Sequence, residues 1–128
     1  MPPPSSGGGT VLEILGVLKR FRMAALDPDS AFAMHLFAEA SRIAFADRDA
    51  WYGDPQHMVL APSDLLTAPY LASRAALIDP AQAVQGAVAP GRPKPHAAVQ
   101  AMDVELPSTT HLSIVDARGN AVSLTESI

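Results

Sequence analysis

The sequence contains no cysteine, which excludes a disulfide framework, a thiol nucleophile and thiolate metal sites. No apolar run approaches the roughly 20 residues needed to span a bilayer, and the first residues lack the charged and apolar regions of a signal peptide. The chain also lacks a run of basic residues, and its formal net charge is −4. Nucleic acid is therefore not an expected partner.

Length and composition are those of one globular domain at most. The chain has 128 residues, of which 48% are hydrophobic and 17% are charged, and these fractions are typical of folded rather than disordered proteins. The glycine-rich start is not a phosphate loop, because it lacks the Gly-Lys-Ser/Thr ending, and no cofactor is expected. No metal site is expected either. His35 and His57 have no neighbours at metal-ligand spacing, and we expect both at the surface.

The start of the chain predicts a loop followed by a helix. Residues 2–9 are rich in proline, serine and glycine, which favours an entry loop. Such a loop can also present backbone N–H groups to a ligand, so a binding role stays open. Thr10 and Glu13 have the spacing of a capping box at the helix start. The apolar stripe expected of this helix contains Val11, Ile14, Leu15 and Leu18.

A second helix is predicted from the Asp-Pro-Asp-Ser run at 27–30 to about Trp51, because acidic residues and an early proline mark a helix start. Arg48, near its end, allows two interpretations. It either holds a substrate carboxylate or makes a structural ion pair or cap with the turn at 53–55, and the second is the simpler. The buried face is expected to contain Leu36, Phe37, Ala40, Ile43 and Ala44.

The middle of the chain predicts short helical pieces and then irregular structure. After a short turn at 62–64, Thr67 should cap a third helix that runs to about Leu77, with Pro69 in its first turn. The Asp-Pro pair at 79–80 should begin another short helical piece. From 86 to 106, repeated prolines and glycines argue against regular structure, over a length that is uncommon inside a compact domain.

The last stretch, residues 109–128, predicts a β-hairpin. Apolar and polar residues alternate on both sides of a three-residue loop, residues 117–119, in which Gly119 suits the left-handed position. A slip of one residue would mix the two faces, so the pattern favours a single register. In that register Asp116 faces Asn120 next to the loop. The apolar face pairs Ile114 with Val122 and Leu112 with Leu124, and the hydroxyl-rich face pairs Ser113 with Ser123, His111 with Thr125 and Thr109 with Ser127.

Three runs of the chain resemble one family of enzymes. The run STTHLSIVDARGNAVSLTESI (108–128) resembles the processing site and small-subunit start of the gamma-glutamyltranspeptidases, which are N-terminal nucleophile hydrolases. The upstream runs MPPPSSGG (1–8) and FAEASRIAFADRDAWYGDP (37–55) resemble the same family, in the same order.

The resemblance implies an α+β protein with the αββα sandwich of the N-terminal nucleophile hydrolases, of which this chain covers only a part. Residues 1–108 would end the large subunit with a Pro/Gly-rich tail from about 86, and residues 109–128 would begin the small subunit. The protein would then be a zymogen that is cut autocatalytically. The family acts on glutathione and related γ-glutamyl amides, and a periplasmic or secreted location follows from the same resemblance.

The resemblance further implies that the chain is cut between Ser108 and Thr109 and that Thr109 is the nucleophile. A threonine hydroxyl is weak at neutral pH, and enzymes of this class activate it with the nucleophile's own α-amino group. That amine has a pKa of about 7.7 to 8.0, close to where a general base works best. It exists only after the preceding peptide bond has been broken. The γ-glutamyl ester formed on Thr109 would pass to water or to an acceptor amine.

Other residues of the hairpin have weaker assignments. Ser127 corresponds to a hydroxyl residue that supports the nucleophile in the family, and the predicted register places it opposite Thr109. Thr110 and His111 match the TTH start of the family motif. Thr110 is an alternative nucleophile if the cut lies one residue later, and His111 either supports processing or is a structural hydrogen-bonding residue.

Other functional groups of the family fall outside this chain, including those that bind the glutamyl carboxylate and amine. The isolated 128-residue chain is therefore expected to be inactive without its remaining large- and small-subunit segments. Two alternatives stay open. One is an amidase similar to the cephalosporin (glutaryl) acylases of the same fold, and the other is a non-catalytic helical fragment or interaction module.

Overall fold

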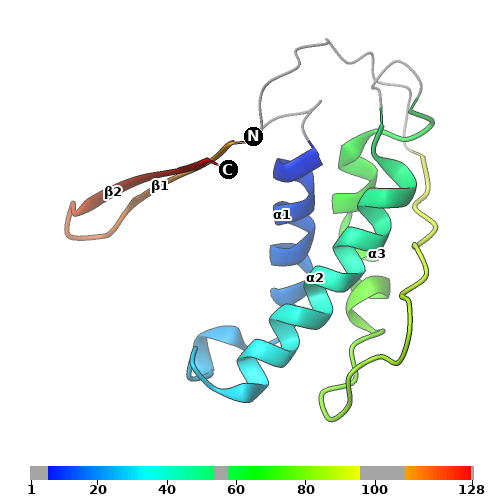
Figure 1. The fold of residues 1–128 in the computed structure, drawn as a ribbon, viewed down its shortest axis with the longest axis horizontal. Helices are drawn as coiled ribbons and strands as arrows, with labels where there is room; N and C mark the ends of the chain where they lie inside the picture. Colours follow the sequence, from blue (N-terminus) through cyan, green and yellow to red (C-terminus); the bar gives the residue numbers. More distant parts are fainter. Residues whose placement is uncertain (1–5, 54–57, 96–108, 128) are drawn as a thin grey trace.

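The computed structural model describes residues 6–53, 58–95 and 109–127. Three helices pack together, and a β-hairpin extends away from them (Figure 1). Helices combined with a two-stranded antiparallel sheet confirm the predicted α+β class. In this described part, no helix has the length and apolar character needed to cross a bilayer. The elements are α1 (Ser6–Leu18), the 3-10 helix η1 (Met23–Ala25), α2 (Ala31–Trp51), the 3-10 helix η2 (Pro62–Leu66), α3 (Ala68–Ala75), β1 (Thr109–Val115) and β2 (Ala121–Ser127).

Helix α1 begins earlier than the sequence predicts. The chain is helical from Ser6, so the loop prediction is wrong for residues 6–9. Thr10 and Glu13 lie inside the helix and are buried, so the predicted capping box is wrong as well. The reason lies in tertiary packing, which overrides the poor helix propensity of glycine. A Cβ at Gly9 would overlap the Tyr52 hydroxyl, so glycine permits the close approach of α1 to the end of α2.

Helix α2 is capped by Ser30, whose hydroxyl accepts a hydrogen bond from the Ala33 N–H at 3.2 Å. The acidic residues at 27 and 29 therefore lie in a turn ahead of the helix and not in its first turn. The predicted end at Trp51 is confirmed. Four of the five residues predicted to face inward are buried, but Phe37 is 56% exposed, and that prediction is wrong.

The segment after α2 contains η2 and α3. Helix α3 follows Thr67 with a proline in its first turn, as predicted, and ends two residues before the predicted Leu77. The Thr67 side chain makes no capping bond and instead donates to the Asp64 carbonyl at 3.3 Å, so the predicted side-chain cap is wrong. The short helical piece predicted at 79–80 is wrong. Asp79 instead begins a tight turn that a bridge to Gln82 closes. In this turn the Asp79 side chain accepts the Ala81 N–H at 2.8 Å, which is a local bond that competes with helix formation. Residues 86–95 are irregular, as predicted, and the rest of the predicted irregular stretch, 96–106, lies outside the described residues.

The hydrophobic core joins α1, α2 and the end of α3. In α1, the predicted stripe is only half correct, because Ile14 and Leu18 are buried whereas Val11 and Leu15 are 53% and 57% exposed. Side chains of this kind each stabilise a fold by about 1.5 to 3 kcal/mol when fully buried. The core consists of Ile14, Val17, Leu18, Leu36, Ala40, Ile43, Ala44, Ala75 and Ile78.

The hairpin has the predicted register. The Cα pairs include Thr109 with Ser127, Leu112 with Leu124 and Ser113 with Ser123. Gly119 has φ +83°, the left-handed conformation that the loop requires. The apolar face is open to solvent, with Leu112, Ile114, Val122 and Leu124 between 46% and 60% exposed.

Candidate functional site

The predicted catalytic residues lie at the open end of the hairpin. Thr109, Thr110 and His111 begin β1, and Ser127 is the last residue of β2. Strand pairing sets the Cα atoms of Thr109 and Ser127 opposite each other, so the backbone brings together two of the residues predicted to act together. Ser108, on the other side of the predicted cut, lies outside the described residues.

The closed end of the hairpin is fixed by Asp116. Its Oδ1 accepts the N–H groups of Arg118 at 2.8 Å and Asn120 at 2.9 Å, and its Oδ2 accepts the Asn120 side-chain amide at 2.7 Å. The bond from the Asn120 side chain is the largest of the causes that lower the pKa of Asp116. These contacts fix the turn, and the turn fixes which residue of β2 faces Thr109.

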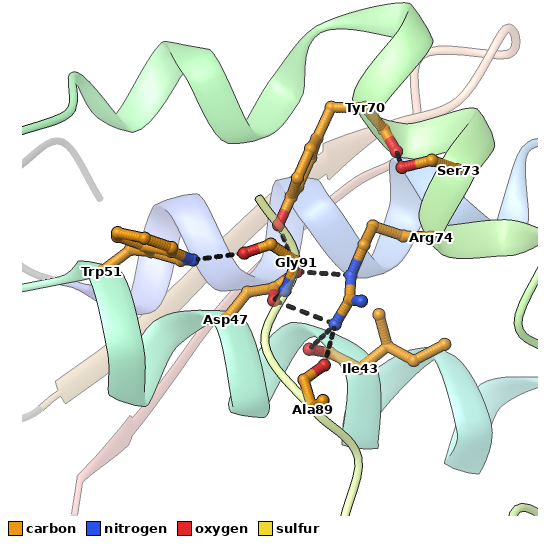
Figure 2. Close-up of polar contacts among 8 residues, drawn as sticks. All are labelled: Ile43, Asp47, Trp51, Tyr70, Ser73, Arg74, Ala89 and Gly91. Atoms are coloured by element: carbon orange, nitrogen blue, oxygen red, sulfur yellow. Dashed lines mark hydrogen bonds and ion pairs between the residues drawn. The ribbon is translucent and has the colours of Figure 1, made fainter. Parts of the chain in front are cut away.

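A second polar centre lies between the helices, around Asp47 of α2 (Figure 2). Asp47 is fully buried. Its Oδ2 accepts the Tyr70 hydroxyl at 2.8 Å and Arg74 Nε at 2.7 Å. Its Oδ1 accepts Arg74 Nη2 at 2.9 Å and the Gly91 N–H at 2.6 Å. A carboxylate offers about four acceptor positions, so donors from α3 and from the segment after it saturate Asp47.

The same centre binds the backbone on both sides of Pro90. Arg74 Nη2 also donates to the Ala89 carbonyl at 3.0 Å, and the Trp51 indole N–H donates to the Gly91 carbonyl at 3.1 Å (Figure 2). A Cβ at Gly91 would overlap the Tyr70 hydroxyl and lie 2.9 Å from Arg74 Cδ. Any side chain at this position would force Tyr70 or Arg74 to move. We name this set, Asp47, Trp51, Tyr70 and Arg74 around residues 89–91, the Asp47 clamp.

A second pair of side chains on α2 binds the preceding part of the same segment. Arg42 Nη1 bridges Glu39 Oε1 at 2.9 Å and the Val84 carbonyl at 2.8 Å. Arg42 Nη2 donates to the Gly86 carbonyl, and Glu39 Oε2 accepts the Val84 N–H at 3.2 Å. The segment from 84 to 91 is therefore held along α2 at two points.

Glu13 of α1 lies beside the Asp47 clamp. It is fully buried, and neither of its carboxyl oxygens has a hydrogen-bond partner among the described residues. Burial is the main cause that raises the pKa of Glu13 to about 9, and Asp47 adds to the rise while Arg74 opposes it. Four donors already occupy the Asp47 carboxylate, so Asp47 acts on Glu13 as a nearby negative charge. Burial, with a smaller effect of Glu13, raises the pKa of Tyr52 to about 12.

The other residues that the sequence singled out have structural contacts. His35 is half-buried, and its Nε2 lies 2.8 Å from the Asp79 carbonyl, so the surface prediction is only partly correct. Arg48 is half-buried and lies over the Phe45 ring, 5.4 Å from its centroid, a packing contact. His57 lies outside the described residues. Within the ranges that the structure describes, no three His, Asp or Glu side chains are grouped as metal ligands.

The Asp47 clamp was not predicted, although one signal was available. Asp47 follows Leu36, Ala40 and Ile43 at the helical spacing that marks the inward face of α2. A charged residue at a core position almost always has a partner. That signal indicates a buried ion pair, but it does not identify Arg74 or Gly91 as the partners.

Comparison with known proteins connects the whole chain to a family. The family model described as Gamma-glutamyltranspeptidase matches residues 1–128. The chain is 41% identical over 125 residues to a "Glutathione hydrolase proenzyme" of Pseudomonas sp. (strain A14), covering 97% of this chain and 20% of that protein. It is 35% identical over 127 residues to an "Acylase ACY 1 proenzyme" of Pseudomonas sp. (strain SE83), covering 99% of this chain and 21% of that protein.

A solved structure gives the same result. The crystal structure of Helicobacter pylori gamma-glutamyltranspeptidase superposes with a TM-score of 0.62 at 32% sequence identity, covering 66% of this chain and 24% of that one. The chain thus spans about a fifth of the length of the curated relatives that it matches.

Proposed function

The chain belongs to the gamma-glutamyltranspeptidase family, and we therefore propose that the protein hydrolyses or transfers γ-glutamyl groups with Thr109 as its nucleophile. One observation carries the proposal: a family-matched hairpin begins at Thr109 and pairs it with Ser127. The word proenzyme in the names of the relatives supports a cut precursor.

We propose that Thr109 acts twice. In the precursor its hydroxyl attacks the carbonyl of Ser108, and water hydrolyses the resulting ester, which leaves Thr109 as a new N-terminus. The free α-amine, with an ordinary pKa of about 7.7 to 8.0, then serves as the base for the same hydroxyl. The hydroxyl attacks the γ-amide carbonyl of the substrate, the amine leaves, and the γ-glutamyl ester passes to water or to an acceptor amine.

The neighbouring residues have supporting roles in this proposal. Ser127 supplies a hydroxyl beside the nucleophile, which the facing Cα positions support. His111 assists processing or holds the hairpin by hydrogen bonding. Thr110 is the alternative nucleophile, since a cut one residue later would give it the free amine.

The domain arrangement is part of the same proposal. Residues 1–108 would end the large subunit, with a tail from about 86, and residues 109–128 would begin the small subunit within an αββα sandwich. The exposed apolar face of the hairpin and the exposed Phe37 and Phe45 of α2 support further layers, because contiguous exposed apolar side chains mark surfaces that another element covers. The isolated chain would then be inactive for lack of substrate-binding groups and of its remaining subunit segments.

Glutathione and related γ-glutamyl amides are the proposed substrates, and a periplasmic or secreted location goes with that substrate class. A second candidate is an amidase of the acylase type. It is favoured by the 35% identity to an acylase proenzyme over 99% of this chain. Turnover of glutaryl amides without turnover of γ-glutamyl anilides would select it.

The test is intact mass with N-terminal sequencing of the complete open reading frame that encodes this chain. We expect a new N-terminus at Thr109, lost in Thr109→Ala and kept in the matched control Thr110→Ala. Loss in Thr110→Ala alone would move the nucleophile by one residue. An uncut product that hydrolyses no γ-glutamyl anilide would refute the proposal.

A further inference from the structure

We propose that the Asp47 clamp is a positioning device for self-cleavage, which fixes the chain at Gly91 and keeps it fixed after the cut. Residues 92–108, 17 residues in all, separate this anchor from Thr109. The inference rests on the proposed function, because it concerns the step that exposes Thr109. Asp47 acts through its bonds to Tyr70, Arg74 and Gly91, so it is a positioning residue.

The anchored segment is recognised by its backbone. Arg42, Arg74 and Trp51 donate to carbonyl groups of residues 84, 86, 89 and 91. Glu39 and Asp47 accept the N–H groups of Val84 and Gly91. Bonds of this kind fix the path of the chain, and hydrogen bonds to ionised groups are about twice as strong as neutral ones.

The clamp is selective for glycine at its last contact. The Gly91 N–H reaches a fully buried carboxylate at 2.6 Å. A Cβ on residue 91 would overlap the Tyr70 hydroxyl, and Tyr70 itself is held by Asp47 at 2.8 Å. At Gly91, a close backbone approach therefore coincides with bonds to both the N–H and the carbonyl group, as expected of an anchor.

The anchor lies on the correct side of the proposed cut to survive it. Its contacts follow the order of α2, since Glu39 and Arg42 bind residues 84–86 and the later Asp47 and Trp51 bind Gly91. Every bonded residue precedes Ser108. Breaking the Ser108–Thr109 bond removes none of these contacts, so the tail of the large subunit stays on the helices in the precursor and in the cut protein.

Self-cleavage is an intramolecular reaction whose rate depends on how well the reacting groups are placed. Loss of one hydrogen bond to a buried charged group shifts an equilibrium by about 10- to 100-fold. If placement of the junction requires the clamp, opening the clamp slows processing by a factor in this range. The alternative is that the anchor only shortens the free chain before Thr109. Opening the clamp would then lengthen that chain back to Gly86, the next residue bonded to α2, and would change the processing rate by less than about twofold.

The experiment measures the half-life of the precursor made by pulsed cell-free synthesis of the complete open reading frame. We expect Gly91→Ala to slow processing at least tenfold and Trp51→Phe, which removes only the indole donor, to slow it a few-fold. The matched control is Gly53→Ala, because a Cβ at Gly53 meets nothing within 4 Å, and it should process like the wild type. Leu36→Ala destabilises the core away from the clamp. Under conditions in which this variant is folded, its precursor should have the half-life of the wild type.

A rate for Gly91→Ala within twofold of the wild type would overturn the proposal. Equal slowing by Leu36→Ala would overturn it too, since only general stability would then be at work. Hydrogen exchange at the Gly91 amide should show equal protection in the Thr109→Ala precursor and in the cut wild type, and protection lost after the cut would contradict a permanent anchor. Cleavage that persists in Thr109→Ala would instead refute the proposed nucleophile, a result that the Gly91→Ala measurement cannot produce.

Discussion

Glu13→Gln should stabilise the protein, and the gain should grow with pH. Burial raises the pKa of Glu13 from 4.5 to about 9, so between these values the folded state keeps a proton that the unfolded chain releases. The folded state then binds more protons than the unfolded state. The free energy of unfolding of the wild type falls as pH rises through this window, by about 1.4 kcal/mol per pH unit for this group.

The expected size follows from that slope. Between about pH 5.5 and pH 8, the Glu13 carboxyl removes up to about 3 kcal/mol of stability. The carboxamide in Glu13→Gln is neutral at every pH, so the substituted protein lacks this pH-dependent loss of stability. The neighbouring groups are unchanged; they are Asp47, Arg74, Tyr52 and Tyr70. The two proteins should differ by less than about 1 kcal/mol at the acidic end, where both side chains are neutral and of similar shape.

Urea unfolding at several pH values, followed by the fluorescence of Trp51, the single tryptophan, measures the difference. Glu39→Gln is the matched control, because Glu39 is also buried in a helix but is paired with Arg42 at 2.9 Å. That substitution should destabilise the protein at every pH. Parallel stability profiles of the wild type and Glu13→Gln would show that Glu13 is ionised in the fold, and the account of this cluster would be wrong.

Two further substitutions test the clamp and the hairpin. Arg74→Met leaves Asp47 without its counter-charge, so the free energy of unfolding in urea should fall by about 3 to 5 kcal/mol. The control Arg22→Met, at an exposed position, should change this free energy little. An Arg74→Met protein as stable as the wild type would refute the pairing. Gly119→Ala forces a side chain onto φ +83° and should destabilise the hairpin by about 1 to 2 kcal/mol, seen as weaker nuclear Overhauser contacts between Leu112 and Leu124, whereas Gly53→Ala should leave those contacts unchanged.

The hairpin was predictable in full because its signals are local. Alternation with a period of two, together with a single glycine in the loop, allows one register only. The existence of the three helices was predictable for the same reason. The start of α1 was not, because its glycines are poor helix formers and the close approach of Gly9 to Tyr52 leaves no local signal in the sequence.

The inward faces were harder to predict than the helices themselves. Phe37 is adjacent in sequence to the buried Leu36 and is apolar, yet it points outward. Periodicity gives the width of an apolar stripe, but which edge of the stripe is buried depends on the neighbouring element. The same limit applies to Val11 and Leu15, which are apolar and exposed on α1.

The Asp47 clamp lay beyond prediction for a different reason. Its bonds to the bound segment run from side chains of α2 and α3 to backbone atoms of residues 89–91, and backbone N–H and carbonyl groups carry little sequence information. Such contacts leave no pattern in the bound segment except the glycine at 91. The residues proposed to be catalytic were assigned from resemblance, and Thr109 and Ser127 stay predictions that the facing Cα positions support.

Backbone recognition has a practical consequence for labelling this protein. Between Val84 and Gly91, the side chain of Val88 packs against the core, but those of Gln85 and Ala87 are exposed and contribute nothing to the anchoring bonds. Either position can therefore accept a new residue while the path of the chain is preserved. Because the sequence has no cysteine, Gln85→Cys would carry one dye or spin label at a known site beside α2.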